Sequence, residues 1–241
     1  MKKTLSDFFN NGKVIFGMIH LAGKDSKEKI DRALDEINIY EEENLNGVII
    51  EDYHGTIEDV EKTLRVAWKL FNIKIGINTL RNPYLAFELA NKYNTNFIQF
   101  DTIQTSEGDE NNPKRFNEQL YKSLREKYSH IFVFGGVRFK YIPLTGKTLE
   151  EDITDGMMKC DAIVTTGSGT GIKTPTQKLR DFRGIMGNFP LIIGAGVTAQ
   201  NVKEQLTIAD GAVIGSYFKH GDTEAKVDRQ NVRKLVNLAR G

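Results

Sequence analysis

Short apolar runs recur along the chain, and each ends at a glycine or a polar residue. They begin near positions 14, 47, 75, 97, 131, 162, 191 and 212. Apolar runs of about four to six residues with such boundaries are typical of buried parallel strands. The predicted strand ends are His20, Glu51, Asn78, Asp101, Lys140, Gly167, Gly194 and Gly215.

The segments between these runs have helical periodicity. Ile30, Ala33, Leu34 and Ile37 are spaced as one face of a helix, which predicts a helix over 27–44. Comparable stripes follow the second and third runs and mark the last helix, where Val232, Leu235, Val236 and Ala239 share a face. Four start signals accompany them: the capping-box pairs Thr56 with Asp59 and Thr148 with Glu151, and the caps followed by proline at Asn82-Pro83 and Thr174-Pro175-Thr176-Gln177.

Eight strand–helix units in one direction predict an α/β fold, a single (β/α)₈ TIM barrel over residues 1–241. Residues 1–12 are expected to form a short N-terminal helical cap, with Leu5, Phe8 and Phe9 closing the N-terminal mouth. The polar stretch 102–115 is expected to be a mobile loop. The rival, a doubly wound sheet, would normally show a Gly-x-Gly-x-x-Gly turn after its first strand, whereas this chain has Met-Ile-His-Leu.

Charge and composition narrow the classes of partner. The chain has 33 basic and 32 acidic residues, a net charge of +1, so no electrostatic feature favours nucleic acid or a membrane surface. No run approaches the ~18 apolar residues of a membrane span, and the single cysteine excludes an internal disulfide. We expect a soluble cytoplasmic protein without membrane insertion, and outward-facing helices that suit a homo-oligomer.

The last two predicted strands end in glycine turns that carry a hydroxyl residue. Glycine lets the backbone approach a ligand closely, and phosphate sites of TIM barrels often follow strands seven and eight. The predicted phosphate-binding residues are Gly194, Gly196, Thr198, Gly215, Ser216 and Lys219. The preceding glycine-rich loop is predicted to cradle substrate through Ser168, Gly169 and Thr170.

The polar residues at the other strand ends are the catalytic candidates, because TIM-barrel active sites lie at the C-terminal ends of the strands. His20 suits proton transfer, since histidine titrates near neutrality. Glu51 is preferred to Asp52 because neighbours in a strand point to opposite faces. Asp101 is a candidate carboxylate base, or an ion-pair partner of Lys140.

Lys140 could neutralise an oxyanion, bind a carboxylate, form a Schiff base or make a structural ion pair. Asn78 and Arg81, which flank a turn, are predicted to bind substrate. The histidines show no paired ligand spacing and there is one cysteine, so a structural zinc site is not expected. No cofactor is identified; Mg²⁺ bound by Glu51 or Asp101 is the remaining alternative.

Several short sequence motifs, in chain order, resemble those of the BtpA family, which includes SgcQ-type proteins, over residues 13–239. They are Gly17-Met-Ile-His-Leu, Gly47-Val-Ile-Ile-Glu, Gly76-Ile-Asn-Thr-Leu-Arg-Asn, Val137-Arg-Phe-Lys, Thr166-Gly-Ser-Gly-Thr-Gly, Gly194-Ala-Gly-Val-Thr with Asn201, and Ala209-Asp-Gly-Ala-Val-Ile-Gly-Ser with Lys219. The resemblance implies a phosphate-binding barrel, similar to ribulose-phosphate-binding barrels. The chain departs from the family after Leu21, where Ala-Gly-Lys-Asp-Ser replaces a proline-rich loop, and at Asp101, where members often carry another polar residue.

Two functions follow from the resemblance and the residues together. One is an enzyme acting on a phosphorylated small molecule, a sugar phosphate or nucleotide, by acid/base chemistry; isomerase, lyase and glycosidic cleavage reactions all fit. The other is a non-catalytic assembly factor that keeps a ligand-binding barrel, since the family takes its name from a role in photosystem I accumulation. The fold alone does not decide between these two functions.

Overall fold

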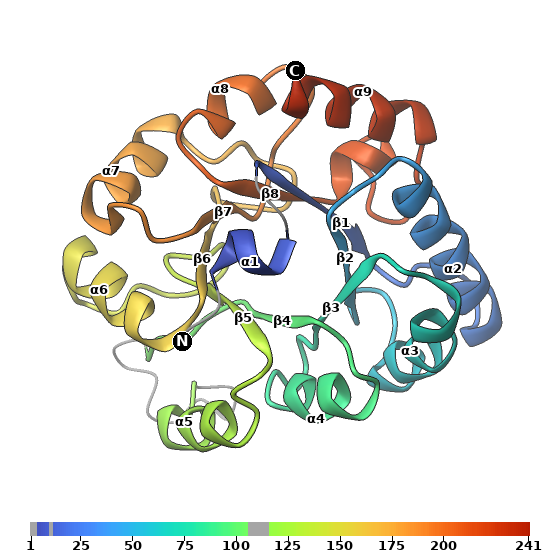
Figure 1. Cartoon of the computed structure of the whole chain (residues 1–241), viewed down its shortest axis with the longest axis horizontal. Coiled ribbons are helices and arrows are strands. Elements are labelled where there is room, and N and C mark those ends of the chain that lie inside the picture. Colours follow the sequence, from blue (N-terminus) through green and yellow to red (C-terminus); the bar gives the residue numbers. More distant parts are fainter. Residues whose placement is uncertain (1–3, 10–11, 106–115) are drawn as a thin grey trace.

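The computed structural model describes residues 4–9, 12–105 and 116–241. In these residues eight parallel strands pair in sequence order and close into a barrel ringed by helices (Figure 1). The predicted (β/α)₈ TIM barrel is therefore confirmed. The strands are β1 (Val14–Ile19), β2 (Gly47–Glu51), β3 (Lys74–Asn78), β4 (Phe97–Phe100), β5 (Phe132–Gly136), β6 (Ala162–Thr165), β7 (Leu191–Ile193) and β8 (Gly211–Ile214).

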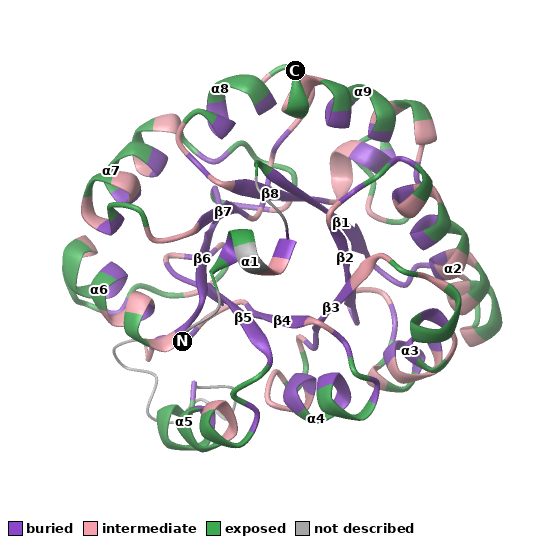
Figure 2. Cartoon of the chain, viewed as in Figure 1, coloured by how far each residue is buried: buried purple, intermediate pink, exposed green. Residues whose placement is uncertain are grey.

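The helices turn their apolar faces to the barrel. Figure 2 shows buried strands, and helices that are buried on the inner side and exposed on the outer side. This is the arrangement that the 3.6-residue periodicity predicts. The helices are α1 (Leu5–Phe9), α2 (Ser26–Glu42), α3 (Ile57–Leu70), α4 (Leu85–Lys92), α5 (Glu118–Lys127), α6 (Leu149–Lys159), α7 (Thr176–Met186), α8 (Val202–Leu206) and α9 (Arg229–Arg240), with the 3₁₀ helix η1 (Ser216–Lys219) after β8.

Two of the four predicted helix starts are confirmed. Thr56 and Thr148 form complete capping boxes with Asp59 and Glu151, which satisfy free N–H groups of the first turn. The other two were wrong. Helix α4 begins only at Leu85, because the carbonyl of Asn82 is used in a preceding turn, where it accepts from the Leu85 N–H at 3.1 Å.

Helix α7 also lacks a side-chain cap. The residue at its N-cap position is Pro175, not the predicted Thr174. The Thr174 hydroxyl donates to the carbonyl of Ala195 at 3.2 Å and not to the first turn of the helix. This bond ties the start of α7 to the turn after β7. The threonine therefore serves the loop packing at the C-terminal mouth rather than its own helix.

The N-terminal mouth is filled by aromatic rings. Helix α1 lies across the middle of the barrel ring (Figure 1). Its Phe9 ring makes edge-on contacts with Phe16 at 4.9 Å and Phe97 at 5.3 Å between ring centroids. Phe132 and Phe134 complete the cluster. Burial of such rings stabilises this end of the barrel.

The fifth strand is shorter than predicted. It ends at Gly136, four residues before Lys140. The backbone of Asp101 presses against Gly136 so closely that a Cβ there would lie 2.0 Å from the Asp101 carbonyl oxygen. Arg138 then has φ +50°, which turns the chain away from the sheet. Lys140 therefore reaches the mouth from a loop.

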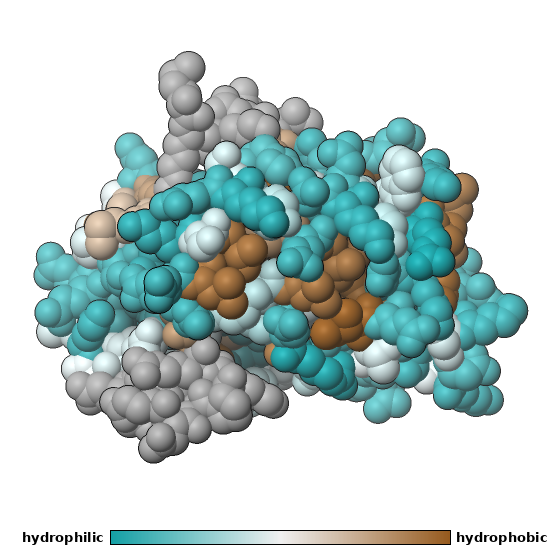
Figure 3. Space-filling model, turned by 90° about the horizontal axis from the view of Figure 1, so that it is seen from below, coloured by the Kyte–Doolittle hydropathy of each residue, from teal (hydrophilic) through white to brown (hydrophobic). Residues whose placement is uncertain are grey.

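The loop predicted to be mobile at 102–115 lies mostly outside the described residues. Its described start is packed against the barrel, since Ile103 is fully buried and Gln104 nearly so. Figure 3 views the molecule from the side on which α4 and α5 lie, and there apolar patches lie among mostly hydrophilic side chains. Among the described residues, no helix is long and apolar enough to cross a membrane.

Candidate active site

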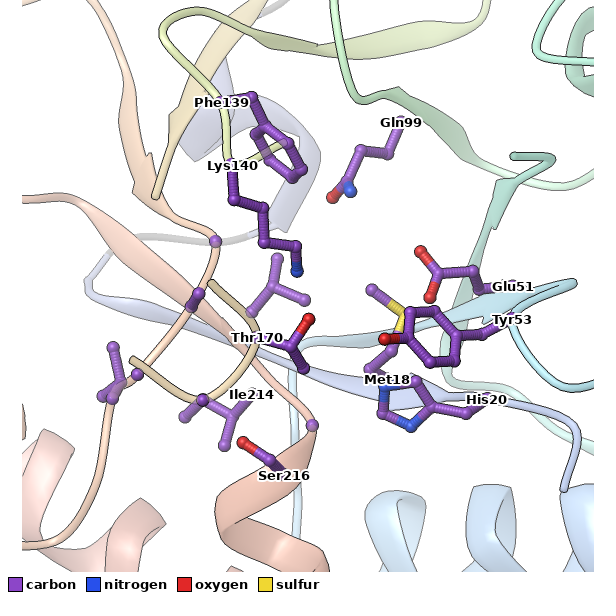
Figure 4. Close-up of a pocket in the computed structure, with 17 residues that line it drawn as sticks. Met18, His20, Glu51, Tyr53, Gln99, Phe139, Lys140, Thr170, Ile214 and Ser216 are labelled. Carbon is purple, nitrogen blue, oxygen red and sulfur yellow. The ribbon is translucent and has the colours of Figure 1, made fainter. Parts of the chain in front are cut away.

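Polar side chains converge at the C-terminal ends of the strands. They line a narrow pocket, here called the central pocket, with a volume of about 30 Å³, roughly that of one water molecule. In Figure 4, Lys140 and Thr170 extend into it from one side, and Glu51 and Tyr53 from the other. Its lining residues other than glycine are Met18, His20, Glu51, Tyr53, Gln99, Phe139, Lys140, Thr170, Ala195, Val197, Val213, Ile214 and Ser216.

A pair of carboxyl groups bridged by one amide is the chemical centre of this site. Asn78 Nδ2 donates to Glu51 Oε1 at 2.7 Å and to Asp101 Oδ1 at 3.0 Å. Glu51 and Asn78 are direct partners in the β2–β3 ladder, so the parallel register places them side by side. The three predicted site residues at the ends of β2, β3 and β4 are thus brought together.

The pair is held partly protonated. Burial, followed by the nearby charge of Asp101, raises the pKa of Glu51 from its usual 4.5 to about 8. Burial likewise raises the pKa of Asp101. Two carboxyls this close titrate as a unit. Near neutral pH the pair can therefore hold a proton, with Glu51 as a candidate general acid.

Lys140 supplies the positive charge facing this pair. Its charge lowers the pKa values of both Glu51 and Asp101, opposing the effect of burial. No carboxylate of the described residues lies within ion-pair distance of Lys140 Nζ. The Lys140 backbone is fixed by an N–H bond to Thr166 Oγ1 at 2.6 Å. The structural ion pair considered for this residue is therefore not formed.

His20 differs from its expected state. It is 4% exposed, and burial with the positive charge of Lys219 lowers its pKa well below 6.5. This direction favours the neutral imidazole, so the expectation that His20 titrates near neutrality is corrected, while its role in proton transfer stays a prediction. Gly215 makes room for the ring: a Cβ at Gly215 would lie 2.6 Å from His20 Cε1.

Three buried polar atoms at this pocket have no hydrogen-bond partner within the described parts of the chain. They are His20 Nδ1, Gln99 Oε1 and Thr170 Oγ1. Buried polar atoms are normally paired, because leaving one unpaired costs about 1–3 kcal/mol. Unpaired atoms gathered at one pocket indicate a site that a ligand or ordered water completes.

The turns after β7 and β8 form a backbone-lined cleft beside the central pocket, here called the β7/β8 cleft. Gly196 has φ +73°, and a Cβ there would lie 2.2 Å from the Ile172 carbonyl oxygen, so the β6 loop rests directly on the β7 turn. No backbone hydrogen bond within the described segments uses the N–H of Gly196, Val197 or Ser216. The cleft has a volume of about 460 Å³ and also contains Thr198.

Lys219 does not reach this cleft, which corrects the prediction that it binds phosphate. Its side chain is fully buried, and its Nζ forms an ion pair with Glu36 on α2 at 2.9 Å. Arg32 binds the same carboxylate at 3.1 Å. Because Glu36 is 183 residues away in sequence, no local pattern indicates this pairing. The lysine anchors η1 to α2.

Two other predicted substrate contacts lie away from the central pocket. Arg81 Nη1 donates to Asp52 Oδ2 and to the carbonyls of Asp52 and Gly55, so it joins the β2 and β3 loops. Ser168 is exposed and is not part of the central-pocket lining, whereas Gly169 is buried and Thr170 lines the pocket.

Sequence reasoning missed Tyr53, Gln99 and Phe139 as pocket residues. A signal existed for two of them. Gln99 precedes Asp101 by two positions and Tyr53 follows Glu51 by two, and alternate residues of an extended segment share a face. Within the described residues, no group of three His, Cys, Asp or Glu side chains is placed to hold a metal ion.

A comparison with models of protein families identifies the family to which this chain belongs. The model of the BtpA family matches residues 12–241. The chain therefore belongs to the BtpA family. The resemblance stated from sequence phrases is confirmed over nearly the whole chain.

Relatives of this BtpA-family protein align along almost their full length. An uncharacterized protein of Archaeoglobus fulgidus is 26% identical over 95% of this chain and 99% of its own. The photosystem I biogenesis protein BtpA of Synechocystis is 22% identical over 95% of this chain and 88% of its own.

Solved structures share the fold at low identity. Phosphoribosylanthranilate isomerase from Pyrococcus furiosus superposes with a TM-score of 0.61 at 14% identity, covering 94% of this chain and 98% of that chain. Thiamine phosphate pyrophosphorylase from Pyrococcus furiosus gives a TM-score of 0.62 at 12% identity, covering 94% and 95%. Both names refer to phosphorylated compounds, and at these identities the likeness shows the barrel fold alone.

Proposed function

We propose that this BtpA-family protein is an enzyme that acts on a phosphorylated small molecule by acid/base chemistry at the C-terminal face of the barrel. The observation that carries the proposal is the amide-bridged pair of Glu51 and Asp101, with Glu51 opposite Lys140 across the central pocket (Figure 4). A raised carboxyl pKa beside a cation, in a pocket with unpaired polar atoms, is typical of a catalytic site.

The β7/β8 cleft binds the phosphate group in this proposal. The N–H groups of Gly196, Val197 and Ser216 are free to donate, and the hydroxyls of Thr198 and Ser216 lie at the same cleft. Two structurally similar enzymes have names that refer to phosphorylated compounds, which supports this choice. Binding energy from the phosphate would then hold the reacting atoms at the carboxyl pair.

The chemistry proposed for the pair is proton transfer. Glu51 holds a proton near neutral pH and donates it, Asp101 accepts one, and Lys140 stabilises negative charge that develops on the substrate. Neutral His20 offers a hydrogen bond from or to its unpaired Nδ1. Isomerisation, elimination and glycosidic cleavage all use this set of roles.

The name of the Synechocystis relative favours a second candidate function, an assembly factor whose barrel binds a ligand without turning it over. The two candidates differ in what Glu51 does. If the protein is an enzyme, replacing Glu51 by a residue that cannot transfer a proton abolishes conversion of a bound compound. In the assembly factor, no bound compound is converted at all.

Binding is tested first, by thermal unfolding with inorganic phosphate, ribose 5-phosphate, glucose 6-phosphate and nucleoside 5′-monophosphates. A ligand at 100 times its Kd stabilises by about 2.7 kcal/mol. We expect Ser216→Glu, which places a negative charge in the cleft, to abolish that shift. Ser168→Glu, the same change on the exposed neighbouring loop, should retain it. A shift that survives Ser216→Glu, or no shift with any compound, contradicts the phosphate site.

Turnover is tested second, by ³¹P NMR of the compound that binds. The enzyme proposal expects conversion by the natural protein and at least a hundredfold loss in Glu51→Gln, with binding retained. Binding without conversion in the natural protein favours the assembly factor.

A further inference from the structure

A second cleft opens on the other side of the carboxyl pair, between the loops after β3 and β4. It is here called the β3/β4 cleft, and its volume is about 500 Å³, within the range of small-molecule sites. Its lining includes the apolar side chains Leu80, Pro83, Tyr84 and Ile142. The proposed phosphate site and its chemistry do not account for this cleft.

The carboxyl pair lies between this cleft and the central pocket. Glu51 lines the central pocket, Asp101 lines the β3/β4 cleft, and Asn78 is bound to both carboxyls. The Asp101 carboxyl accepts hydrogen bonds from Asn78 and Gln99, and both end on Oδ1. The second oxygen, Oδ2, is available to a group in the cleft.

The polar residues of the cleft come from the end of β3 and the loops after β3 and β4 and include Asn78, Arg81 and Asp101. Arg81 is anchored through one nitrogen, Nη1, by three acceptors of the β2 loop, which holds its guanidinium at the cleft wall. A planar guanidinium favours stacking on a flat ring. Apolar walls with a carboxyl and a guanidinium suit a ring that carries nitrogen or oxygen at its edge.

We propose that the β3/β4 cleft binds the non-phosphorylated end of the substrate, a planar heteroaromatic ring, so that the substrate is of nucleotide type and not a simple sugar phosphate. This inference rests on the proposed function. The phosphate occupies the β7/β8 cleft, the ring occupies the β3/β4 cleft, and the carboxyl pair faces the bonds between them.

The narrow central pocket sets a condition for this binding mode. With about 30 Å³ free, the connecting part of a substrate fits only if neighbouring side chains rotate. Lys140 and Tyr53 border that space, and neither side chain is held by a hydrogen bond to another described residue; Tyr53 makes ring contacts with His20 and His54. Both can move without breaking a buried polar contact.

The test compares ribose 5-phosphate with the common nucleoside 5′-monophosphates by calorimetric titration. We expect at least one nucleotide to bind tenfold or more tightly than ribose 5-phosphate. In Ile142→Asp, that nucleotide should lose at least tenfold in affinity while ribose 5-phosphate stays within twofold. Leu144→Asp is the matched control, because Leu144 is on the same loop, 64% exposed, and outside the cleft lining.

Leu80→Asp, in the loop after β3, provides a second variant in case Ile142→Asp fails to fold. Retained binding of ribose 5-phosphate shows that either variant is folded. Equal affinity for ribose 5-phosphate and every nucleotide, or nucleotide affinity unchanged in both cleft variants, overturns the inference and leaves the phosphate site standing. Absence of binding by all these compounds, with no thermal shift of the natural protein, overturns the proposed function itself.

Discussion

The two mouths of the barrel are built on opposite principles. At the N-terminal mouth, Phe9 of α1 packs among Phe16, Phe97 and Phe134, so apolar rings fill the space. At the C-terminal mouth, His20, Gln99 and Thr170 each leave a buried polar atom unpaired. The first arrangement favours folding through apolar burial, whereas the second costs folding free energy. In a TIM barrel this asymmetry separates the stabilising end from the functional end.

The largest expected effect is the loss of stability when an aromatic ring is removed from the N-terminal mouth. Phe9→Ala removes a ring that is 2% exposed, and such truncations cost about 3–5 kcal/mol because they leave a cavity. Urea unfolding at neutral pH measures the loss. Phe8→Ala is the matched control: its ring is only partly buried, so its loss should be clearly smaller. Equal losses would mean that α1 does not plug the barrel in solution.

The second prediction concerns how the stability of the protein depends on pH through Glu51 at the C-terminal mouth. The native pKa of Glu51 is about 8, above its usual 4.5, so the native state binds more protons than the unfolded state between these values. The stability that this group contributes is therefore present below about pH 4.5 and is lost as the pH rises towards 8. The slope is at most about 1.4 kcal/mol per pH unit.

Urea midpoints at pH 5 and pH 8 measure this loss. Glu51→Gln keeps a similar shape but cannot titrate, so its midpoint should fall less over the same interval. The buried carboxyl of Asp101 contributes with the same sign in both proteins, because its pKa is also raised. Identical pH profiles for the natural protein and Glu51→Gln would contradict a raised pKa at position 51.

The fold was largely predictable from the sequence because its signals are local. Runs such as Gly47-Val-Ile-Ile-Glu show both the burial and the end of a strand. The fifth strand was the exception, since Val137 and Phe139 continue the apolar pattern beyond Gly136. The chain leaves that strand at Arg138, which has φ +50°, and the Asp101 backbone, which is not local in sequence, packs against Gly136.

The candidate site was predictable only in part. Parallel strands place their carboxyl ends together, so the meeting of Glu51, Asn78 and Asp101 follows from the topology. The protonation of His20 and the partner of Lys219 did not follow, because both depend on burial among distant residues. Residue type and strand position indicate where chemistry is placed, while charge state depends on the assembled surroundings.

The smallest expected effect is the change in stability when Gln99 is replaced, and it tests the contrast between the two mouths most directly. Gln99 is 2% exposed; its Nε2 makes a long bond of 3.3 Å to Asp101 and its Oε1 has no partner among the described residues. Gln99→Leu removes the unpaired acceptor at little cost in volume, so we expect a gain of about 1 kcal/mol in stability together with weaker ligand binding. Gln104→Leu is the control, because that buried amide donates twice to Asp152, at 2.8 and 3.2 Å, and its loss should destabilise. If Gln99→Leu destabilised the protein as Gln104→Leu does, the Gln99 amide would be a structural group like any other, and the contrast between the two mouths would not extend to it.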